Sequence, residues 1–477
     1  MAQKTLIVIG AGAAGLVVAI GAAKAGKKVL LIDKGNWGGD CTNFGCIPSK
    51  SLIASAHAAH AIQSSAALGI NCTASPLDTA GALKRLRGIV SGFRSHENPE
   101  ELRKLGIDAI EGAASFVDPY TIQVTDSKGF KTLFKGKKIV IATGSSATIP
   151  PIEGLEKTPY LTNETLFALE KIPPRLIILG GGPIGCEMAQ AMQRLGCQVE
   201  LISSHNGILM KEDGRAQKTL ADIFVKEGIR IHRDAHATSV SYASGKFVLK
   251  LASNGIQELE AEQLLVAVGR RPQLEALNLP AAGISFSSQG ISVDAYGRTN
   301  QSHIFAIGDV TGKELFTHAA EHEARAVLSS LLLPWNQKID SQAVPRVTFT
   351  DPEVASVGLN EKQALQRYGA KKIAVYTVAL KDVDRAVTAG ETEGFVIVIT
   401  KKWSSRIVGA CIVAPRAGEM LMELCVAMHG NIPLRTLARI IHPYPTYSLA
   451  IRKAADLYLT QTLLPPLLKI KTLFRGK

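Results

Sequence analysis

The chain has 477 residues, of which 46% are hydrophobic and 20% are charged. This length exceeds what one ordinary core accommodates, so we expect about three globular domains. Lysine and arginine together number 54 against 41 aspartates and glutamates, but the basic residues are scattered and only 5% of residues are aromatic. Nucleic-acid binders concentrate basic residues in runs, so we expect no nucleic-acid partner and a basic surface that favours anionic ligands.

The chain starts with a lysine and an apolar run, KTLIVIGAGAAGLVVAIGAA (residues 4–23). Such a run superficially resembles a signal peptide, but three glycines at fixed spacing within it indicate a buried strand and helix. We therefore expect a cytoplasmic protein.

A strand–turn–helix–strand pattern occurs twice, at an offset of 170 residues. Residues 6–33 read LIVIGAGAAGLVVAIGAAKAGKKVLLID, and residues 176–203 read LIILGGGPIGCEMAQAMQRLGCQVELIS. The three glycines of each copy allow a tight turn, the approach of a pyrophosphate and close packing of the helix on the strand. They predict two dinucleotide-binding units of Rossmann type, with phosphates at helix N-termini. The aligned glycines are Gly10, Gly12 and Gly15 in the first copy and Gly180, Gly182 and Gly185 in the second.

The two copies differ at the end of their second strand. Asp33 ends this strand in the first copy, where a carboxylate binds a ribose hydroxyl. The second copy has Ser203 there, followed by Ser204 and His205, with Lys211 further along. A neutral residue does not repel a 2′-phosphate, so this position favours NADPH and is also compatible with NADH.

Seven cysteines are too few and too scattered for a disulfide-stapled secreted fold. Five of them have no neighbours at metal-ligand spacing, so we predict no metal site. These five are Cys72, Cys186, Cys197, Cys411 and Cys425.

The other two cysteines lie in the stretch DCTNFGCIPSK (residues 40–50). Residues five apart on a regular helix point about 140° apart, and a disulfide requires Cα atoms roughly 4.4–6.8 Å apart. Cys41 and Cys46 can therefore join only where the backbone is irregular, which Gly45 permits. Lys50 lies one helical turn after Cys46, and a cation and a helix start both lower a thiol pKa. The pair is predicted to be redox-active, and the alternative is two buried free cysteines.

This stretch resembles the redox-active segment of the flavin-dependent pyridine nucleotide–disulfide oxidoreductases. That family includes dihydrolipoamide dehydrogenase, glutathione reductase and mercuric reductase. The resemblance extends from about residue 4 to about residue 460 and is carried by further motifs in order. These are IVIATGS (139–145), VAVGRRP (266–272), IFAIGDV (304–310), FTHAAEHEA (316–324) and VPRVTFTDPEVASVGL (344–359).

The resemblance implies an α/β fold with two Rossmann-type dinucleotide-binding domains and a C-terminal α+β dimerisation domain. An FAD-binding domain would comprise residues 1–148 and 270–340, and an NAD(P)H-binding domain residues 149–269. An interface domain would span 341–460. The remaining residues, 461–477, form a basic apolar tail with four basic residues and no acidic ones. Contact of this tail with an anionic membrane surface is a weaker alternative to a surface-packed or poorly ordered chain end.

The resemblance also implies the cofactors. The first glycine unit would hold FAD, and the second would hold NADPH or NADH. Lys50 would lie near the flavin and pair with Glu187, Asp309 would bind the ribityl chain, and His318 and Ala319 would start a helix that faces the flavin. The cofactor-binding residues implied in this way are Gly10, Gly12, Ala14, Gly15, Asp33, Lys34, Gly39, Lys50, Ala113, Thr143, Gly144, Gly180, Gly182, Gly185, Glu187, Ser203, Gly269, Arg270, Gly308, Asp309, His318 and Ala319.

The implied reaction, in a homodimer, is a relay from NAD(P)H through FAD to the Cys41–Cys46 disulfide and on to a small-molecule or metal-ion acceptor. Cys46 would lie nearer the flavin as a thiolate, and Cys41 would attack the substrate. One alternative is an NAD(P)H quinone reductase, or diaphorase, in which the cysteine pair is not essential. Another is a redox-sensing flavoprotein with little turnover.

The C-terminal acid–base motif departs from the family pattern. Disulfide reductases have a histidine, then Pro-Thr, and a glutamate five places after the histidine, all acting from the partner subunit. This chain reads IHPYPTYSLA at residues 441–450. Aligning its Pro-Thr pair puts Tyr444 in the histidine's place and Leu449 in the glutamate's, whereas aligning His442 puts Tyr447 in the glutamate's place. We favour the first alignment because the residues after it then continue as the expected helix.

Tyr444 and His442 are thus the candidate acid–base residues, and neither alignment supplies a carboxylate. A tyrosine titrates near pH 10 and is a poor base, so efficient dithiol oxidation is not expected. Mercuric reductases also have a tyrosine there, but residues 461–477 lack their C-terminal cysteine pair. The acceptor stays open among a disulfide, a metal ion, a quinone and a reactive oxidant.

Overall fold

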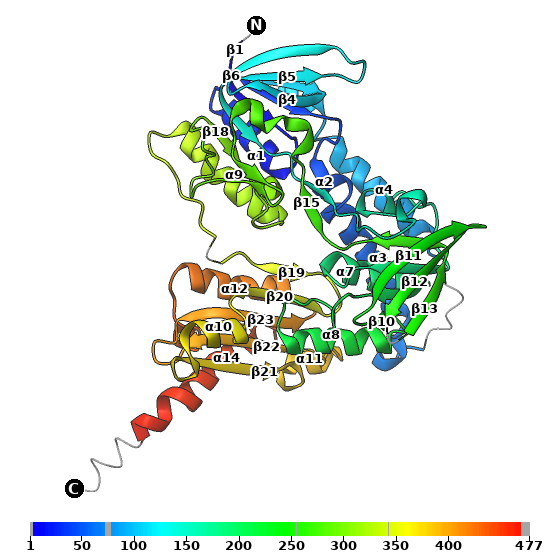
Figure 1. Cartoon of the computed structure of the whole chain (residues 1–477). Helices are drawn as coiled ribbons and strands as arrows, with labels where there is room; N and C mark the ends of the chain where they lie inside the picture. Colours follow the sequence, from blue (N-terminus) through cyan, green and yellow to red (C-terminus); the bar gives the residue numbers. More distant parts are fainter. Residues whose placement is uncertain (1–2, 72–77, 254, 342, 469–477) are drawn as a thin grey trace.

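The computed structural model describes residues 3–71, 78–253, 255–341 and 343–468. Figure 1 shows three main bodies of sheet and helix. Two sheets are built around parallel strands, and the third, formed by the C-terminal part of the chain, is antiparallel. The predicted α/β fold with a C-terminal α+β part is confirmed.

The first sheet has the strand order β3-β2-β1-β6-β5-β4, and β18 adds to β6. Helices α1 (Ala13–Lys24) and α9 (Thr317–Leu332) cover one face, where Val18 and Val327 join one hydrophobic core with the strands. The central strands are buried on both faces, which is why they read as unbroken apolar runs. The strands are β1 Gln3–Ile9, β2 Val29–Asp33, β3 Ile107–Glu111, β4 Ala113–Asp118, β5 Thr121–Thr125, β6 Lys131–Ile141 and β18 Ile304–Ala306.

The second sheet repeats the start of the first. Its parallel strands have the order β10-β9-β8-β14, and helix α7 (Pro183–Arg194) follows β8 as α1 follows β1. Each bound of α7 lies 170 residues after that of α1, so the predicted internal repeat is confirmed. The strands are β8 Arg175–Leu179, β9 Gln198–Ile202, β10 Arg230–His232 and β14 Gln263–Val266. A three-stranded antiparallel sheet packs beside them, with strands β11 His236–Ala243, β12 Lys246–Ser253 and β13 Gly255–Ala261.

A two-stranded ribbon joins the first two sheets. Strand β7 (Ser145–Ala147) leaves the first sheet, and β15 (Arg270–Pro272) returns to it after the second. The two strands pair antiparallel, with Arg270 opposite Ala147. Both chain crossings between the sheets therefore lie side by side.

The third sheet has the order β19-β20-β23-β22-β21, and its core includes helices α12 (Ala417–His429) and α14 (Leu449–Tyr458). Its strands are β19 Arg346–Thr348, β20 Glu353–Gly358, β21 Ile373–Ala379, β22 Phe395–Lys401 and β23 Ile407–Ala414. The remaining α-helices are α2 Gly39–Asn43, α3 Cys46–Gln63, α4 Ala80–Arg94, α5 Pro99–Lys104, α6 Asn163–Leu166, α8 Gly214–Lys226, α10 Glu361–Tyr368, α11 Asp384–Ala389 and α13 Leu434–Leu437.

The chain end projects from the third sheet as a helix in Figure 1. A π-helical turn (Leu459–Leu463) continues α14, and Thr462 is buried there, 2.7 Å from the Tyr376 hydroxyl. Residues 469–477 of the predicted tail lie outside the described residues. Within the described ranges, no helix is both long enough and apolar enough to span a bilayer.

Candidate active site

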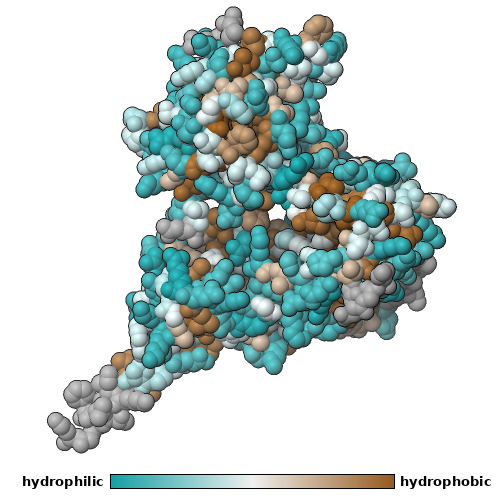
Figure 2. All heavy atoms as spheres, in the orientation of Figure 1, coloured by the Kyte–Doolittle hydropathy of each residue, from teal (hydrophilic) through white to brown (hydrophobic). Residues whose placement is uncertain are grey.

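A single large cavity of about 2010 Å³ connects the two glycine turns with the cysteine pair. In Figure 2 the molecule is hollowed between the bodies that Figure 1 draws above and below. This volume exceeds that of an ordinary small-ligand pocket and suits two dinucleotides. The predicted residues that line it are Gly10, Gly12, Ala14, Asp33, Lys34, Gly39, Cys41, Cys46, Lys50, Thr143, Gly144, Gly180, Gly182, Glu187, Ser203, Gly269, Arg270, Gly308, Asp309, His318 and Ala319.

The first glycine of each turn requires its residue type for two reasons. Gly10 and Gly180 have φ angles of +104° and +120°, which residues with a side chain rarely adopt. A Cβ on either would also collide with a carbonyl oxygen, of Ala142 or of Ala267 respectively. The turns therefore present bare backbone to the cavity.

Two predicted glycines pack behind the turns instead of lining the cavity. A Cβ on Gly15 would strike the Gly10 carbonyl oxygen, and one on Gly185 would strike that of Gly180. Their role is the close approach of helix and strand. Ala113 also lies outside the lining, because it starts the edge strand β4 and pairs with Thr125.

The residue at the end of the second strand makes different hydrogen bonds in the two glycine units. Asp33 accepts the Ala11 N–H at 2.8 Å and the N–H groups of Gly35 and Asn36 at 2.9 Å. Ser203 is buried and donates its hydroxyl to the Gly207 carbonyl at 2.7 Å. Only the first turn therefore offers a carboxylate at this position.

The two cysteines lie on either side of a break between two helices. Helix α2 ends at Asn43 and α3 begins at Cys46, with Gly45 between them outside both helices. A Cβ on Gly45 would come within 2.9 Å of the Asp40 carboxylate, so this close approach favours glycine. The predicted irregular backbone is confirmed.

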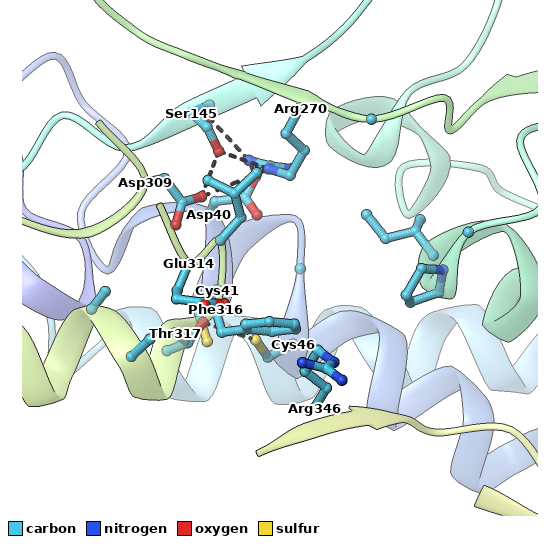
Figure 3. A pocket seen from close by; sticks show the side chains of 18 of the residues that line it. Asp40, Cys41, Cys46, Ser145, Arg270, Asp309, Glu314, Phe316, Thr317 and Arg346 are labelled. Carbon is cyan, nitrogen blue, oxygen red and sulfur yellow. Dashed lines mark hydrogen bonds and ion pairs between the residues drawn. The ribbon is translucent and has the colours of Figure 1, made fainter. Parts of the chain in front are cut away.

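Both cysteines are free thiols here and hydrogen bond to each other. The bond from Cys41 lowers the pKa of Cys46 to about 6, with further contributions from Thr317 and Lys50, while burial opposes the shift. The same bond and burial raise the pKa of Cys41. Thr317 Oγ1 lies 3.3 Å from the Cys46 sulfur (Figure 3). These directions of the two pKa values favour Cys46 as the thiolate of the pair and Cys41 as the protonated thiol.

Lys50 connects the cysteine helix to the second glycine unit. Its Nζ lies 2.8 Å from Glu187 on α7 and 4.3 Å from the centre of the Phe349 ring. Glu187, which is buried, also accepts the Phe349 N–H at 3.0 Å. The predicted Lys50–Glu187 pair is present, and it fixes the cation within reach of the cavity.

A charged cluster lies above the sulfurs in the view of Figure 3. Arg270 donates to Ser145 Oγ at 2.8 Å and lies 3.2 Å from Asp40 and 3.9 Å from Asp309. Ser145 donates to Asp309 at 2.5 Å. Burial raises the pKa of Asp309, and the bonds from Ser145 and Arg270 oppose that rise.

The N-terminus of α9 faces the cavity beside the sulfurs. Phe316 precedes the helix without a side-chain cap, so the first N–H groups stay available to a ligand with negative charge. The predicted His318 and Ala319 are the second and third residues of this helix, so their N–H groups are among these. The His318 ring itself donates from Nε2 to the Pro345 carbonyl at 2.8 Å, just before β19.

The two acid–base candidates lie outside the cavity lining, on the loop before α14. Tyr444 is 73% exposed and donates to Asp384 on α11 at 2.9 Å. That bond raises the pKa of Tyr444. The His442 ring is only 5% exposed and lies 3.0 Å from Glu423 on α12. Each candidate thus has a carboxylate, supplied by another element of the fold and not by the local sequence.

Several residues of the site were not predicted from the sequence. Thr317 lies within the motif FTHAAEHEA, at the first position of a helix, which is the signal that would have found it. Asp40, Ser145 and Phe349 also lie within motifs quoted above, which is a signal of the same kind. Asp384 and Glu423 gave no sequence signal, because tertiary contacts alone bring them to the acid–base loop.

Two bare glycine turns that open on one cavity, with a low-pKa thiol beside an uncapped helix, define a dinucleotide-dependent dithiol oxidoreductase. The model of the pyridine nucleotide-disulphide oxidoreductases matches residues 4–324, and the model of their dimerisation domain matches residues 344–455. The chain belongs to this family. It is accordingly an FAD-containing enzyme that uses NADPH or NADH and forms a homodimer.

The relatives include enzymes named for different substrates. Mercuric reductase of Streptomyces lividans is 32% identical, over 95% of this chain and 96% of its own. Dihydrolipoyl dehydrogenase of Chlamydia muridarum is 34% identical, over 92% of this chain and 93% of its own. Among solved structures, the Cu(II) complex of the HOCl-induced flavoprotein disulfide reductase RclA from Escherichia coli has a TM-score of 0.86 and 29% identity, covering 96% of this chain and 100% of that one.

The residues at the first turn fit FAD. The Gly10 turn supplies bare backbone, Asp33 supplies a carboxylate, and α9 directs its free N–H groups to the same cavity. FAD, when bound, accepts a hydride from NAD(P)H and delivers two electrons to sulfur. The described residues contain no group of three or more His, Cys, Asp or Glu that could hold a metal ion.

Proposed function

We propose that the enzyme uses NADPH to reduce a thiophilic metal ion, through the Cys41–Cys46 pair. One NADPH and one proton convert the disulfide to two thiols. The two electrons then reduce either two ions that each take one electron, such as Cu²⁺, or one ion that takes both, such as Hg²⁺. The disulfide forms again and two protons leave.

The observation that carries this proposal is the opposite shift of the two thiol pKa values, lowered for Cys46 and raised for Cys41. Cys46, with a pKa of about 6, holds negative charge beside Lys50 and the α9 N-terminus. Cys41 stays protonated until a substrate displaces its proton. A metal ion binds thiolate sulfur directly, so it replaces the proton that a dithiol substrate would need a base to remove.

The acid–base loop supports a metal ion over a dithiol. We assign Tyr444 to act from the partner subunit as a hydroxyl that stays protonated. The bond to Asp384 raises the pKa of Tyr444, so its hydroxyl is a poor base near neutral pH and cannot take the proton of a dithiol substrate. The named relatives include mercuric reductases and a structure with Cu(II), which is consistent with a metal-ion acceptor.

NADPH is the coenzyme we assign to the second glycine turn. Ser203 offers no carboxylate there, and the exposed residues after it include His205. Lys211 also lines this end of the cavity. A 2′-phosphate at this place would meet no carboxylate and would lie near the basic side chain of Lys211. We also propose the site residues and domain boundaries given above and a cytoplasmic location, without membrane contact by the tail.

Two variants test the acceptor. Turnover with Cu²⁺, Hg²⁺, lipoamide, glutathione disulfide and a quinone should be compared under NADPH and NADH. Cys41→Ser is expected to abolish metal-ion turnover and to leave quinone reduction largely intact. Cys197→Ser, at a buried cysteine outside the cavity lining, is the matched control. Equal loss of both activities in Cys41→Ser, or metal-ion turnover that survives it, would refute the proposal.

A further inference from the structure

The composition predicts a basic surface, and one edge of the first sheet collects many of its lysines. The parallel strands β1 and β2 end at the first glycine turn and at Asp33, so their starts form the opposite edge of the sheet, away from the cavity. Eight exposed lysines lie on the segments at this edge, which we call the lysine edge. They are Lys24, Lys27 and Lys28 at the end of α1 and before β2, and Lys128, Lys131, Lys135, Lys137 and Lys138 on β6 and the turn before it.

Strand pairing brings these lysines together in space. Lys135 lies opposite Gln3 and Lys138 opposite Leu6, so the lysines of β6 flank the start of β1. On the other side of β1, the Leu6 N–H donates to the Lys28 carbonyl at 3.2 Å. Neighbouring strands are about 4.8 Å apart, so the two groups of lysines are separated by roughly 10 Å of sheet. This distance is close to the screening length at physiological salt, which is about 8 Å, so their charges act on a ligand as one field.

Few acidic side chains neutralise the lysine edge. Among the described residues, none of the eight lysines forms an ion pair. The neighbouring Asp108 is paired with Lys4. Asp118 accepts the Tyr120 N–H at 2.7 Å, within its own turn. The edge therefore carries a large excess of positive charge.

The hairpin between β5 and β6 adds apolar side chains to this charge. Phe130 is 69% exposed and Leu133 is 40% exposed. The backbone of the turn is fixed, because Asp126 Oδ1 accepts the N–H groups of Lys128 at 2.9 Å and of Phe130 at 3.0 Å. The Asp126 N–H also donates to the Phe130 carbonyl at 3.1 Å. A large apolar side chain is thus held in solvent at the tip of a hairpin, between lysines.

We propose that the lysine edge docks on an anionic lipid bilayer, with Phe130 at the boundary between headgroups and acyl chains. Lysine clusters beside exposed apolar side chains are the combination that binds such surfaces. None of the eight residues is an arginine, the side chain that suits bidentate binding of single phosphates in nucleic acids. A bilayer offers spread negative charge, which the point charge of an ammonium complements.

The position of the edge is compatible with activity. Figure 1 draws β1, β5 and β6 at one end of the molecule and the third sheet, with the matched dimerisation domain, at the other. β1 is seven residues long, so the start of the strand lies roughly 20 Å from the glycine turn at its end. Docking at this end leaves the mouth of the cavity free, and it does not depend on the identity of the electron acceptor.

Sedimentation of the FAD-loaded dimer with vesicles tests the docking. Vesicles of phosphatidylcholine with about 30% phosphatidylglycerol should bind the protein at low salt, and vesicles of phosphatidylcholine alone should not. Binding should fall at least about tenfold between roughly 0.05 M and 0.5 M salt, because the screening length shortens to a few ångströms. Equal binding to both kinds of vesicle, or binding to neither, would overturn the proposal.

A triple variant locates the contact. Lys131→Gln, Lys135→Gln and Lys137→Gln, combined in one protein, should lower the partition into anionic vesicles by about 10- to 100-fold, since each lysine near such a surface contributes a factor of up to about five. Flavin absorbance and the rate of reduction by NADPH should not change, because the three lysines lie outside the cavity lining. Vesicle binding that survives this variant would refute the lysine edge.

The matched control removes three exposed lysines from the third domain. Lys362→Gln, Lys371→Gln and Lys372→Gln, combined, change the net charge equally and should bind vesicles as the wild type does. Equal losses in the two triple variants would show a response to net charge alone and contradict a defined docking edge.

Phe130→Ser separates a bilayer from other polyanions, because it keeps every charge. It should weaken binding to anionic vesicles by about 3- to 10-fold and leave the salt dependence unchanged. Duplex DNA and polyglutamate serve as the comparison ligands. Binding of either one that the Lys131, Lys135 and Lys137 variant loses, in a protein that ignores vesicles, would assign the edge to a nucleic acid or an acidic protein and overturn lipid docking.

Discussion

The two glycine units have almost the same backbone, and they differ in the residue at the end of the second strand. In the first unit, Asp33 binds three backbone N–H groups, including that of Ala11 in the turn itself. In the second, Ser203 turns its hydroxyl away to Gly207. The glycine spacing thus determines where a dinucleotide lies, and the residue at the strand end determines the charge that its ribose meets.

The largest effect, loss of one bound cofactor, should come from placing a side chain at the first glycine of one turn at a time. Gly10→Val should yield a colourless protein without FAD, because the side chain collides with Ala142 at a φ of +104°. Gly180→Val should stay yellow and be reduced by dithionite but not by NADPH. Flavin absorbance and anaerobic titration measure both outcomes. Loss of FAD in both variants would show that the units are not independent.

The ion pair between Lys50 and Glu187 joins the cysteine helix to the second glycine unit. Removing this ion pair should have the next largest effect. Lys50→Met removes a cation that lowers the pKa of Cys46, so that pKa should rise above about 6. The rate of thiol alkylation at pH 6 should fall by about 3- to 10-fold. Lys34→Met, at the other end of the cavity, should leave the rate unchanged. A fall of the same size in Lys34→Met would contradict a specific link.

The lowered pKa of Cys46 should also make the free energy of unfolding depend on pH. In the folded protein Cys46 titrates at about 6, below the ordinary thiol value of 9.0. Its contribution to the free energy of unfolding is therefore fully present above pH 9 and is lost as the pH falls through 6. Urea unfolding of the reduced protein should give a difference from Cys46→Ser that grows from pH 6 to pH 9, on the order of a few kcal/mol. A constant difference would disprove the assignment of the thiolate.

The smallest effect should come from making the second unit resemble the first. Ser203→Asp supplies the missing carboxylate, which repels a 2′-phosphate and accepts from a ribose hydroxyl. The ratio of kcat/KM for NADPH to that for NADH should fall about tenfold. Steady-state kinetics with a fixed acceptor give the ratio, and Ser204→Asp tests whether position 203 is the specific one. A ratio that does not change would place the selection of coenzyme elsewhere.

The sequence predicted those features that depend on short-range spacing. The strand–turn–helix repeat that contains α1 and α7, the bare turns and the irregular backbone at Gly45 follow from glycines at fixed positions. The Lys50–Glu187 pair joins residues 137 apart and was predictable only through the resemblance to a family. Glu423 and Asp384 were not predictable, because helices 19 and 60 residues away supply them to the acid–base loop. Their acidic side chains look like ordinary surface residues in the sequence.

The paired crossing of β7 and β15 has a consequence for protein engineering. Because Ala147 and Arg270 lie opposite each other, everything between them enters and leaves the rest of the molecule at one place. Neighbouring ends are what allow a segment to be inserted into a host or removed from it. We therefore expect that the intervening 122 residues, 148–269, can be exchanged as one segment between relatives, provided that the core they share with α3 and α4 stays complementary.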